Sequence, residues 1–181
     1  MSEKFGNPAA LGLAAFALTT FLLSLTNAKL APPHLLYLIV PTALIYGGAA
    51  QLIAGIIDLV KTGSTFGGTA FCSYGAFWIS LGIAELLKAR GVWYYYEHEM
   101  GLFLIAWTIF TFYMWIGTRK LGRELKSLFT LLLLTFIALD VGHVLHPYVE
   151  VANTIGGYIG ILTAFNAWYI SATIVLKGGH H

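Results

Sequence analysis

The amino-acid sequence predicts an all-α integral membrane protein with six transmembrane helices. Of its 181 residues, 58% are hydrophobic and 10% are Asp, Glu, Lys or Arg, and the mean hydropathy is +0.78. Soluble domains carry about 25% charged residues, so most of this surface has to face lipid rather than water. The apolar residues also fall into six separate runs, each close to the length of about 20 residues that a spanning helix needs.

The six apolar runs cover roughly residues 9–28, 35–57, 69–87, 101–117, 127–146 and 153–176. We expect helices because lipid offers no hydrogen-bond partners to an exposed backbone. Small residues such as Gly47, Gly48 and Gly55 favour close packing of the second helix. Little sequence is left between the runs, which predicts one membrane domain over residues 1–177. Residues 178–181 resemble the remnant of an expression tag, so His180 and His181 carry no functional argument.

The distribution of Lys and Arg predicts the orientation of the helices. If the N-terminus is cytoplasmic, seven basic residues lie inside and three lie outside, which agrees with the positive-inside rule. The expected location is therefore a cell membrane, with both termini in the cytoplasm. The inside set is Lys4, Lys61, Arg119, Lys120, Arg123, Lys126 and Lys177, and the outside set is Lys29, Lys88 and Arg90.

The remaining composition argues against several classes of protein. A net charge of +2 with scattered basic residues does not favour nucleic acid as a partner. Cys72 is the only cysteine, which excludes an intramolecular disulfide and a thiolate metal site. The sequence has none of the short motifs of nucleotide-binding, zinc-protease or serine-hydrolase sites. We therefore expect neither an enzyme nor a cofactor, and no signal peptide is apparent.

Three ionisable residues near the end of the fifth run form the nearest candidate for a polar site. Asp140, His143 and His146 are spaced i, i+3 and i+6, and the first two share a helical face. As metal ligands they are too few, so no metal site is predicted. A carboxylate within a membrane helix usually marks function, and His titrates near neutrality. Asp140 and His143 are therefore a candidate pair for proton exchange, with a solvated mouth pair as the alternative.

Several motifs carry a resemblance to a known family. Asn7 and Pro8 suit a helix start, and the segment from Asn7 to Leu13 resembles the NPAPLGL signature of the acetate uptake transporter (succinate–acetate permease) family. Ala10 replaces the second proline of that signature. Further matching blocks follow in order over most of the chain: Tyr46-Gly47-Gly48 with Gln51 and Ala54-Gly55, Gly63 to Phe71, Ser73-Tyr74-Gly75 with Phe77-Trp78, and Phe110-Thr111-Phe112 with Gly117-Thr118.

The resemblance implies a six-helix protomer in a hexameric ring, with a separate pathway through each protomer. It also implies transport of acetate and, in some members, of succinate. The motifs place the family's constriction at Phe16 and Tyr74, and counting back from Gly142 adds Leu132. A further pathway position falls on Ala167. The resemblance supplies no role for Asp140.

The residues themselves are compatible with such a pathway. A small carboxylate has an apolar methyl group and a charged end, so its passage needs polar donors and a narrow apolar neck. Asn7 could attract anions at a helix start. The alternative is that the Thr and Ser hydroxyls bond to helix carbonyls or neighbouring helices. The candidate polar lining is Asn7, Thr19, Thr20, Gln51, Ser73 and Thr111.

Other functions remain open from the sequence. Hexameric six-helix channels for a neutral solute such as urea have a similar plan. A membrane cofactor-binding subunit could be built around His143 and His146, and a structural or sensory protein would have no pathway. Passive anion passage and proton-coupled symport are not distinguished either.

Overall fold

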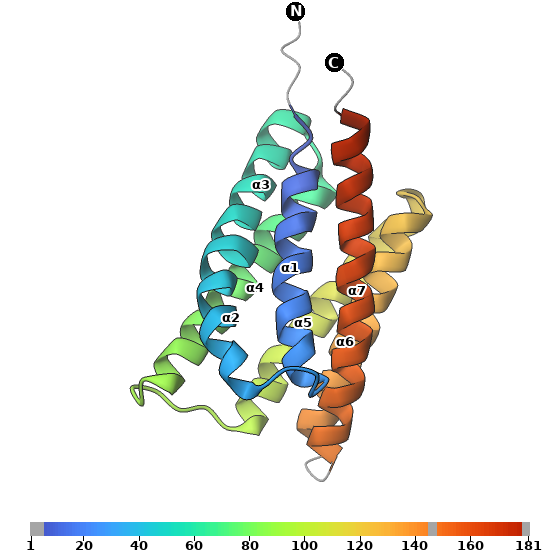
Figure 1. The fold of residues 1–181 in the computed structure, drawn as a ribbon. Coiled ribbons are helices and arrows are strands. Elements are labelled where there is room, and N and C mark those ends of the chain that lie inside the picture. Colours follow the sequence, from blue (N-terminus) through green and yellow to red (C-terminus); the bar gives the residue numbers. More distant parts are fainter. Residues whose placement is uncertain (1–5, 145–147, 179–181) are drawn as a thin grey trace, which may run out of the picture.

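The chain folds into a bundle of six membrane-spanning helices, as the sequence predicts. The computed structural model describes residues 6–144 and 148–178, and no strand occurs in these ranges. The helices lie side by side and run in alternating directions, so the first and last described residues meet at one end of the bundle (Figure 1). We call this the terminal end, and the opposite one the distal end.

The first span is a regular helix with defined stop signals. Helix α1 covers Ala9–Asn27, and the Asn7 side chain accepts a hydrogen bond from the Ala9 amide at 3.0 Å. This bond satisfies one of the amides that a helix start leaves free. The chain leaves the helix at Lys29, whose φ of 58° is left-handed, and turns before Pro32 and Pro33.

The second span, Pro33–Thr62, is continuous but irregular. A 3₁₀ turn at Pro33–Leu35 leads into α2 (Leu36–Thr42), a π-helical segment (Ala43–Ala50), α3 (Gln51–Ile57) and a second π-helical segment (Asp58–Thr62). Pro41 lies inside α2. It has no amide hydrogen, and its ring clashes with the carbonyl four residues earlier, which disturbs a regular helix. The span stops at Gly63, which has a φ of 71°.

The remaining spans are long α-helices. Their ranges are Thr65–Ala89 (α4), Glu97–Gly117 (α5), Arg123–Val144 (α6) and Val149–Gly178 (α7), with a 3₁₀ turn at Thr118–Lys120. The Ser64 hydroxyl caps α4 by accepting from the Gly67 amide at 3.1 Å. The helices extend beyond the apolar runs, since charged residues at their ends, such as Lys88 in α4 and Arg123 in α6, are helical as well. Helical structure therefore continues past the purely apolar stretch.

Helix α1 packs mainly against α7, while α6 lies between α5 and α7, and the second span packs against α4 and α1. Small residues permit the closest of these contacts. A Cβ on Gly55 would lie 2.6 Å from the Cys72 backbone nitrogen, and one on Gly75 would lie 2.8 Å from that of Leu52. The second span and α4 therefore touch backbone to backbone, as small residues allow in membranes.

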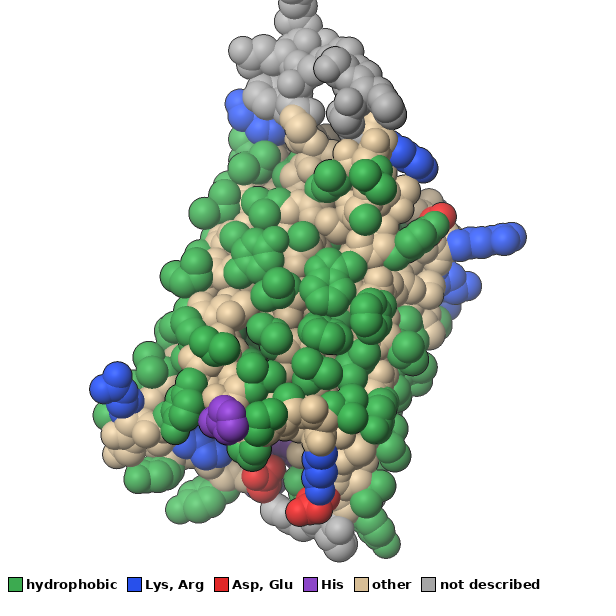
Figure 2. All heavy atoms as spheres, in the orientation of Figure 1, with side chains coloured by type: hydrophobic (Ala, Val, Ile, Leu, Met, Phe, Trp, Pro, Cys, Tyr) green, Lys and Arg blue, Asp and Glu red, His purple; other side chains and the backbone are tan. Residues whose placement is uncertain are grey.

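Hydrophobic side chains cover the middle of the bundle, whereas charged side chains gather toward its two ends (Figure 2). Large apolar side chains such as Ile109 and Phe165 are exposed there. At the distal end, Lys29 and Glu150 form an exposed ion pair at 2.8 Å. This distribution is that of a multi-pass membrane protein.

Candidate functional site

Two cavities lie within the bundle, toward opposite ends. The terminal cavity has a volume of about 590 Å³ and reaches Asn7 and Ser64 at the terminal end. The distal cavity has a volume of about 250 Å³ and reaches Lys88 and Tyr95 at the distal end. Both are large enough for several water molecules or a small organic solute.

Three side chains, Phe16, Tyr74 and Leu132, line both cavities and therefore lie between them. They come from α1, α4 and α6, and their exposed fractions are 6%, 3% and 5%. The Phe16 and Tyr74 rings are 5.9 Å apart between centroids. The structure thus brings together the three residues at which the family resemblance predicted a constriction. We call these three residues the neck.

Tyr74 is held firmly in this position. Its hydroxyl forms a 2.9 Å hydrogen bond with the Thr111 hydroxyl of α5. Its ring packs edge-on against Phe110 and lies near Trp107 and Phe129. Because the Tyr74 hydroxyl is hydrogen-bonded to α5, the part of Tyr74 that faces the cavities is mainly its aromatic ring.

The terminal cavity is apolar near the neck and polar toward its mouth. Asp58 lines it, is buried, and accepts a 2.6 Å hydrogen bond from the Thr62 hydroxyl. Asn7 and Ser64, which line the same cavity, are the side chains that cap α1 and α4. Asp58 was not predicted to line a pathway, because it lies at the end of an otherwise apolar run.

Charged and aromatic groups surround the mouth of the distal cavity. Tyr95, in the linker between α4 and α5, donates its phenol hydrogen to Glu85. The Lys88 ammonium lies 4.1 Å from the centroid of the Tyr95 ring. Burial, and then the bond to Glu85, raise the pKa of Tyr95 above its ordinary value, so the phenol remains a hydrogen-bond donor at neutral pH.

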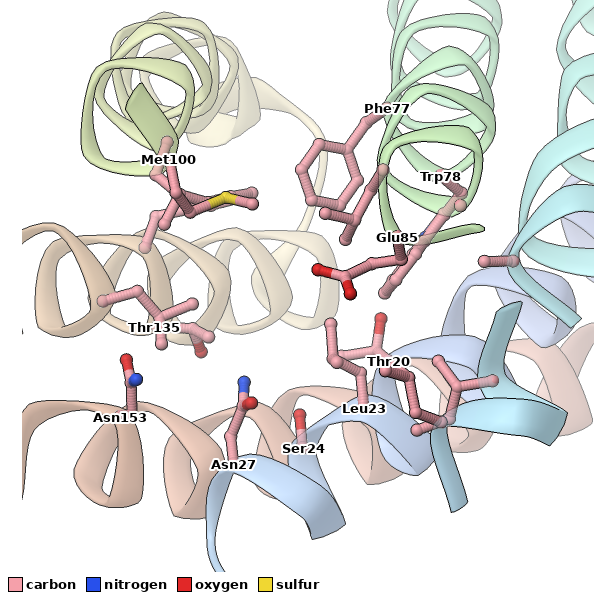
Figure 3. Close-up of a pocket in the computed structure, with 18 of the residues that line it drawn as sticks. Thr20, Leu23, Ser24, Asn27, Phe77, Trp78, Glu85, Met100, Thr135 and Asn153 are labelled. Carbon is pink, nitrogen blue, oxygen red and sulfur yellow. The ribbon is translucent and has the colours of Figure 1, made fainter. Parts of the chain in front are cut away.

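Uncharged polar side chains lie deeper in the distal cavity. Ser24 and Asn27 of α1 lie on the side of Thr135 of α6 and Asn153 of α7, whereas Thr20 lies toward α4 (Figure 3). These groups give the cavity hydrogen-bonding capacity without fixed charge.

The predicted polar lining and the further pathway position Ala167 divide between the cavities and positions outside them. Asn7 lines the terminal cavity and Thr20 the distal one, while Thr111 reaches the neck through its bond to Tyr74. The others, namely Thr19, Gln51, Ser73 and Ala167, line neither cavity.

Two of these interior residues have clear surroundings. The Thr19 hydroxyl bonds back to the Ala15 carbonyl at 3.0 Å, which is the structural alternative raised from the sequence. Gln51 is fully buried, and its side-chain amide has no partner among the described residues.

Asp140 and His143 have separate partners. Asp140 accepts a 2.6 Å hydrogen bond from Thr108 of α5 and does not line either cavity. His143 lines the distal cavity, with its Nε2 3.4 Å from a Glu97 carboxylate oxygen. His146 lies outside the described residues. Within the described ranges, no group of three His, Cys, Asp or Glu side chains could hold a metal.

Trp78, Glu85 and Tyr95 line the distal cavity but were not predicted from the sequence to line a pathway. Helix α4 is apolar on most sides, so its periodicity does not reveal which face meets the cavity. Two signals pointed to Trp78: it belongs to the Phe77-Trp78 block that resembles the family, and the four-residue step from Tyr74 places both residues on one helical face.

Comparison with known proteins gives consistent matches. Residues 1–179 match the model of the GPR1/FUN34/yaaH family. The chain is 36% identical over 177 residues to the succinate-acetate/proton symporter SatP of Escherichia coli K12, covering 97% of this chain and 92% of that protein. It superposes on the structure of the bacterial acetate channel SatP with a TM-score of 0.91 and 34% identity, covering 98% and 96% of the two chains.

A yeast relative is longer. The ammonia transport outward protein 2 of Saccharomyces cerevisiae is 41% identical over 175 residues, which cover 92% of this chain. The chain spans 60% of that protein's length. The ordered motifs and these matches agree, and the chain belongs to the GPR1/FUN34/yaaH family.

Proposed function

We propose that this chain carries acetate, and other small carboxylates such as succinate, across a membrane through a pathway within each protomer. The observation that carries the proposal is the pair of cavities separated by the neck of Phe16, Tyr74 and Leu132. The names of the SatP relatives support the substrate class. The role is transport, without a catalytic step or a cofactor.

The chemistry of the neck suits such a solute. It contains no charged side chain, so it accepts a methyl group and disfavours a solute with a large hydration shell. Polar groups lie on either side, including Asn7 in the terminal cavity and Thr20 in the distal one. A carboxylate could exchange its water for these neutral donors at the two approaches to the neck.

Uptake of labelled acetate into proteoliposomes, with and without a pH gradient, tests the proposal. We expect uptake above that of protein-free liposomes. Stimulation by an inward proton gradient would identify symport, and equal rates would identify a passive channel. Absence of acetate flux from correctly folded protein would overturn the proposal.

A channel for a neutral nitrogen solute is the second candidate. The yeast relative's name concerns ammonia, and an uncharged neck would also pass a neutral molecule. Parallel assays with labelled urea and methylamine separate the two candidates. We expect acetate to be transported faster than either, and the reverse order would favour the second candidate.

We place both termini in the cytoplasm. Lys61, the Arg119–Lys126 cluster and Lys177 lie at the terminal end, whereas Lys29, Lys88 and Arg90 lie at the distal end. In a Cys72→Ala background, an impermeant maleimide added to intact cells should label Arg90→Cys and leave Lys120→Cys unlabelled.

The proton hypothesis for Asp140 and His143 remains part of the proposal. His143 faces the distal cavity and Glu97, so its protonation alters the charge that a carboxylate meets there. We expect His143→Gln to flatten the pH profile of uptake, and Asp140→Asn to change it through the Thr108 contact between α5 and α6. If both variants keep the wild-type profile, this site does not handle protons.

A further inference from the structure

The distal cavity reaches the linker that joins α4 to α5, and one side chain of this linker turns inward. Residues 93–96 are all aromatic, and three of them, Trp93, Tyr94 and Tyr96, are exposed, as aromatic residues at a membrane interface commonly are. Tyr95 is the half-buried member, and it lines the cavity. Its ring therefore lies across part of the cavity mouth while its neighbours face outward.

Beyond Trp93, the linker is attached to α4 through the Tyr95 side chain. The phenol donates its hydrogen to the carboxylate of Glu85, which points into the cavity from α4 (Figure 3). The Lys88 ammonium lies 4.1 Å from the centroid of the same ring. The backbone amides of Tyr94 and Tyr95, in contrast, donate no hydrogen bond within the described residues. Side chains alone make this attachment, so it can be released while both helices stay intact.

The attachment spans a gap between two parts of the bundle. The backbones of α4 and α5 come close at few points. On the other side of the mouth, the Nε2 of His143 in α6 lies 3.4 Å from a carboxylate oxygen of Glu97, at the start of α5. Among the described residues beyond Trp93, only the bond from Tyr95 to Glu85 joins the linker or the first turn of α5 to α4 by a hydrogen bond or ion pair. This bond therefore sets how far α4 and the start of α5 stand apart at the mouth.

The chain around Tyr95 has room to rearrange between two anchored points. On one side the Trp93 amide donates to the Leu87 carbonyl at 3.4 Å, and on the other the Tyr96 amide donates to the Glu99 carboxylate at 2.8 Å. The two residues between these points have no regular secondary structure. Short irregular segments between fixed ends are the usual moving parts of gates over binding cavities.

We propose that Tyr95 is a gate at the distal mouth, held in place by Glu85 and Lys88, and that its opening limits the entry of small carboxylates. In the held position the ring narrows the mouth, and the Glu85 carboxylate repels an incoming anion. After release, Glu85 can pair with Lys88, three residues later on the same face of α4, which neutralises that charge. The inference rests on the proposed function and adds to it a control point separate from the neck.

The first test measures the initial rate of acetate uptake into proteoliposomes. Tyr95→Phe removes the phenol hydroxyl and keeps the ring. Loss of one hydrogen bond to a charged group changes a two-state ratio by about tenfold, so we expect uptake to become severalfold faster. Tyr94→Phe is the matched control, because it removes the same hydroxyl from an exposed neighbour that lines neither cavity. Equal rates for Tyr95→Phe and Tyr94→Phe would overturn the gate.

The second test observes the gate without transport. In a Cys72→Ala background, Leu81→Cys places a thiol in the distal cavity, one helical turn inward from Glu85. We expect a charged, membrane-impermeant methanethiosulfonate to modify this thiol about tenfold faster when Tyr95→Phe is added than when Tyr94→Phe is added. Equal modification rates would overturn the gate while acetate transport itself stood. Absence of acetate uptake by the wild-type protein would instead overturn the proposed function, and faster modification in Tyr95→Phe would still support the gate.

Discussion

Leu132 is the aliphatic member of the neck and lines both cavities. Unlike Phe16 and Tyr74 it has no ring, and it comes from α6, on the far side from the second span. Because Leu132 separates two cavities, shortening its side chain would join existing space and widen the passage between them. A comparably buried residue beside only one cavity serves as its control.

Replacement Leu132→Ala should therefore admit larger acids. We expect the rate for succinate to rise relative to that for acetate by severalfold in proteoliposomes. The stability cost should fall within the range of about 2–5 kcal/mol seen for buried Leu→Ala changes. Leu128→Ala removes the same atoms from a residue that lines only the terminal cavity. An unchanged succinate-to-acetate ratio in folded Leu132→Ala would contradict the assignment of the neck.

Thr19 and Thr20 show what residue types alone could not predict. Both are buried threonines on α1, yet one bonds to its own helix while the other lines the distal cavity. A helix surrounded by apolar neighbours lacks the polar face that would indicate its rotation. The family motifs indicated the neck residues, but they did not indicate which of the two threonines lines the distal cavity.

At the scale of helices, the sequence predicted all six spans and missed the irregularity of the second. The apolar run gave no sign of the π-helical segment at Ala43–Ala50. Pro41 is the one local signal, because it breaks the regular hydrogen-bond pattern just before that segment. The outcome of such a break depends on packing against α1 and α4, which is not encoded locally.

The contact between the second span and α4 depends on glycine. We expect Gly55→Ala to lower the thermal stability of the purified protein by about 1–3 kcal/mol, as overpacking does, because the added carbon would meet the Cys72 backbone. The midpoint of thermal unfolding in detergent measures the effect. Gly6→Ala is the control, since a Cβ there meets no atom within 4 Å. Equal unfolding midpoints for Gly55→Ala and Gly6→Ala would show that the second span and α4 can move apart to accommodate the added methyl group without loss of stability.

At the scale of the whole molecule, the cavities and the outer surface of the bundle bear differently on whether the protein forms an oligomer. The cavities lie inside one protomer, so assembly is not needed to create them. The outer surface of α5 and α7 is richly apolar, with exposed aromatic side chains such as Phe112, Phe165 and Tyr169. Lipid can cover such a surface, whereas a neighbouring protomer would cover it with a fixed geometry.

The backbones of α4 and α5 come close at few points and side chains such as Tyr74 and Thr111 bridge them, so support from a neighbouring protomer would steady this contact. The distal cavity opens beside the linker that joins these two helices, and loss of lateral support there would let the neck and the cavity mouth change shape. We therefore expect protein in mild detergent to form a discrete assembly of about six copies of the 19.8 kDa chain, in line with the hexamer that the family resemblance implies. Native mass spectrometry measures the copy number, and cross-linking in membranes provides the control for detergent effects. Monomers that remain stable and transport acetate at the wild-type rate would show that lipid alone supports the pathway and that the hexamer is not required.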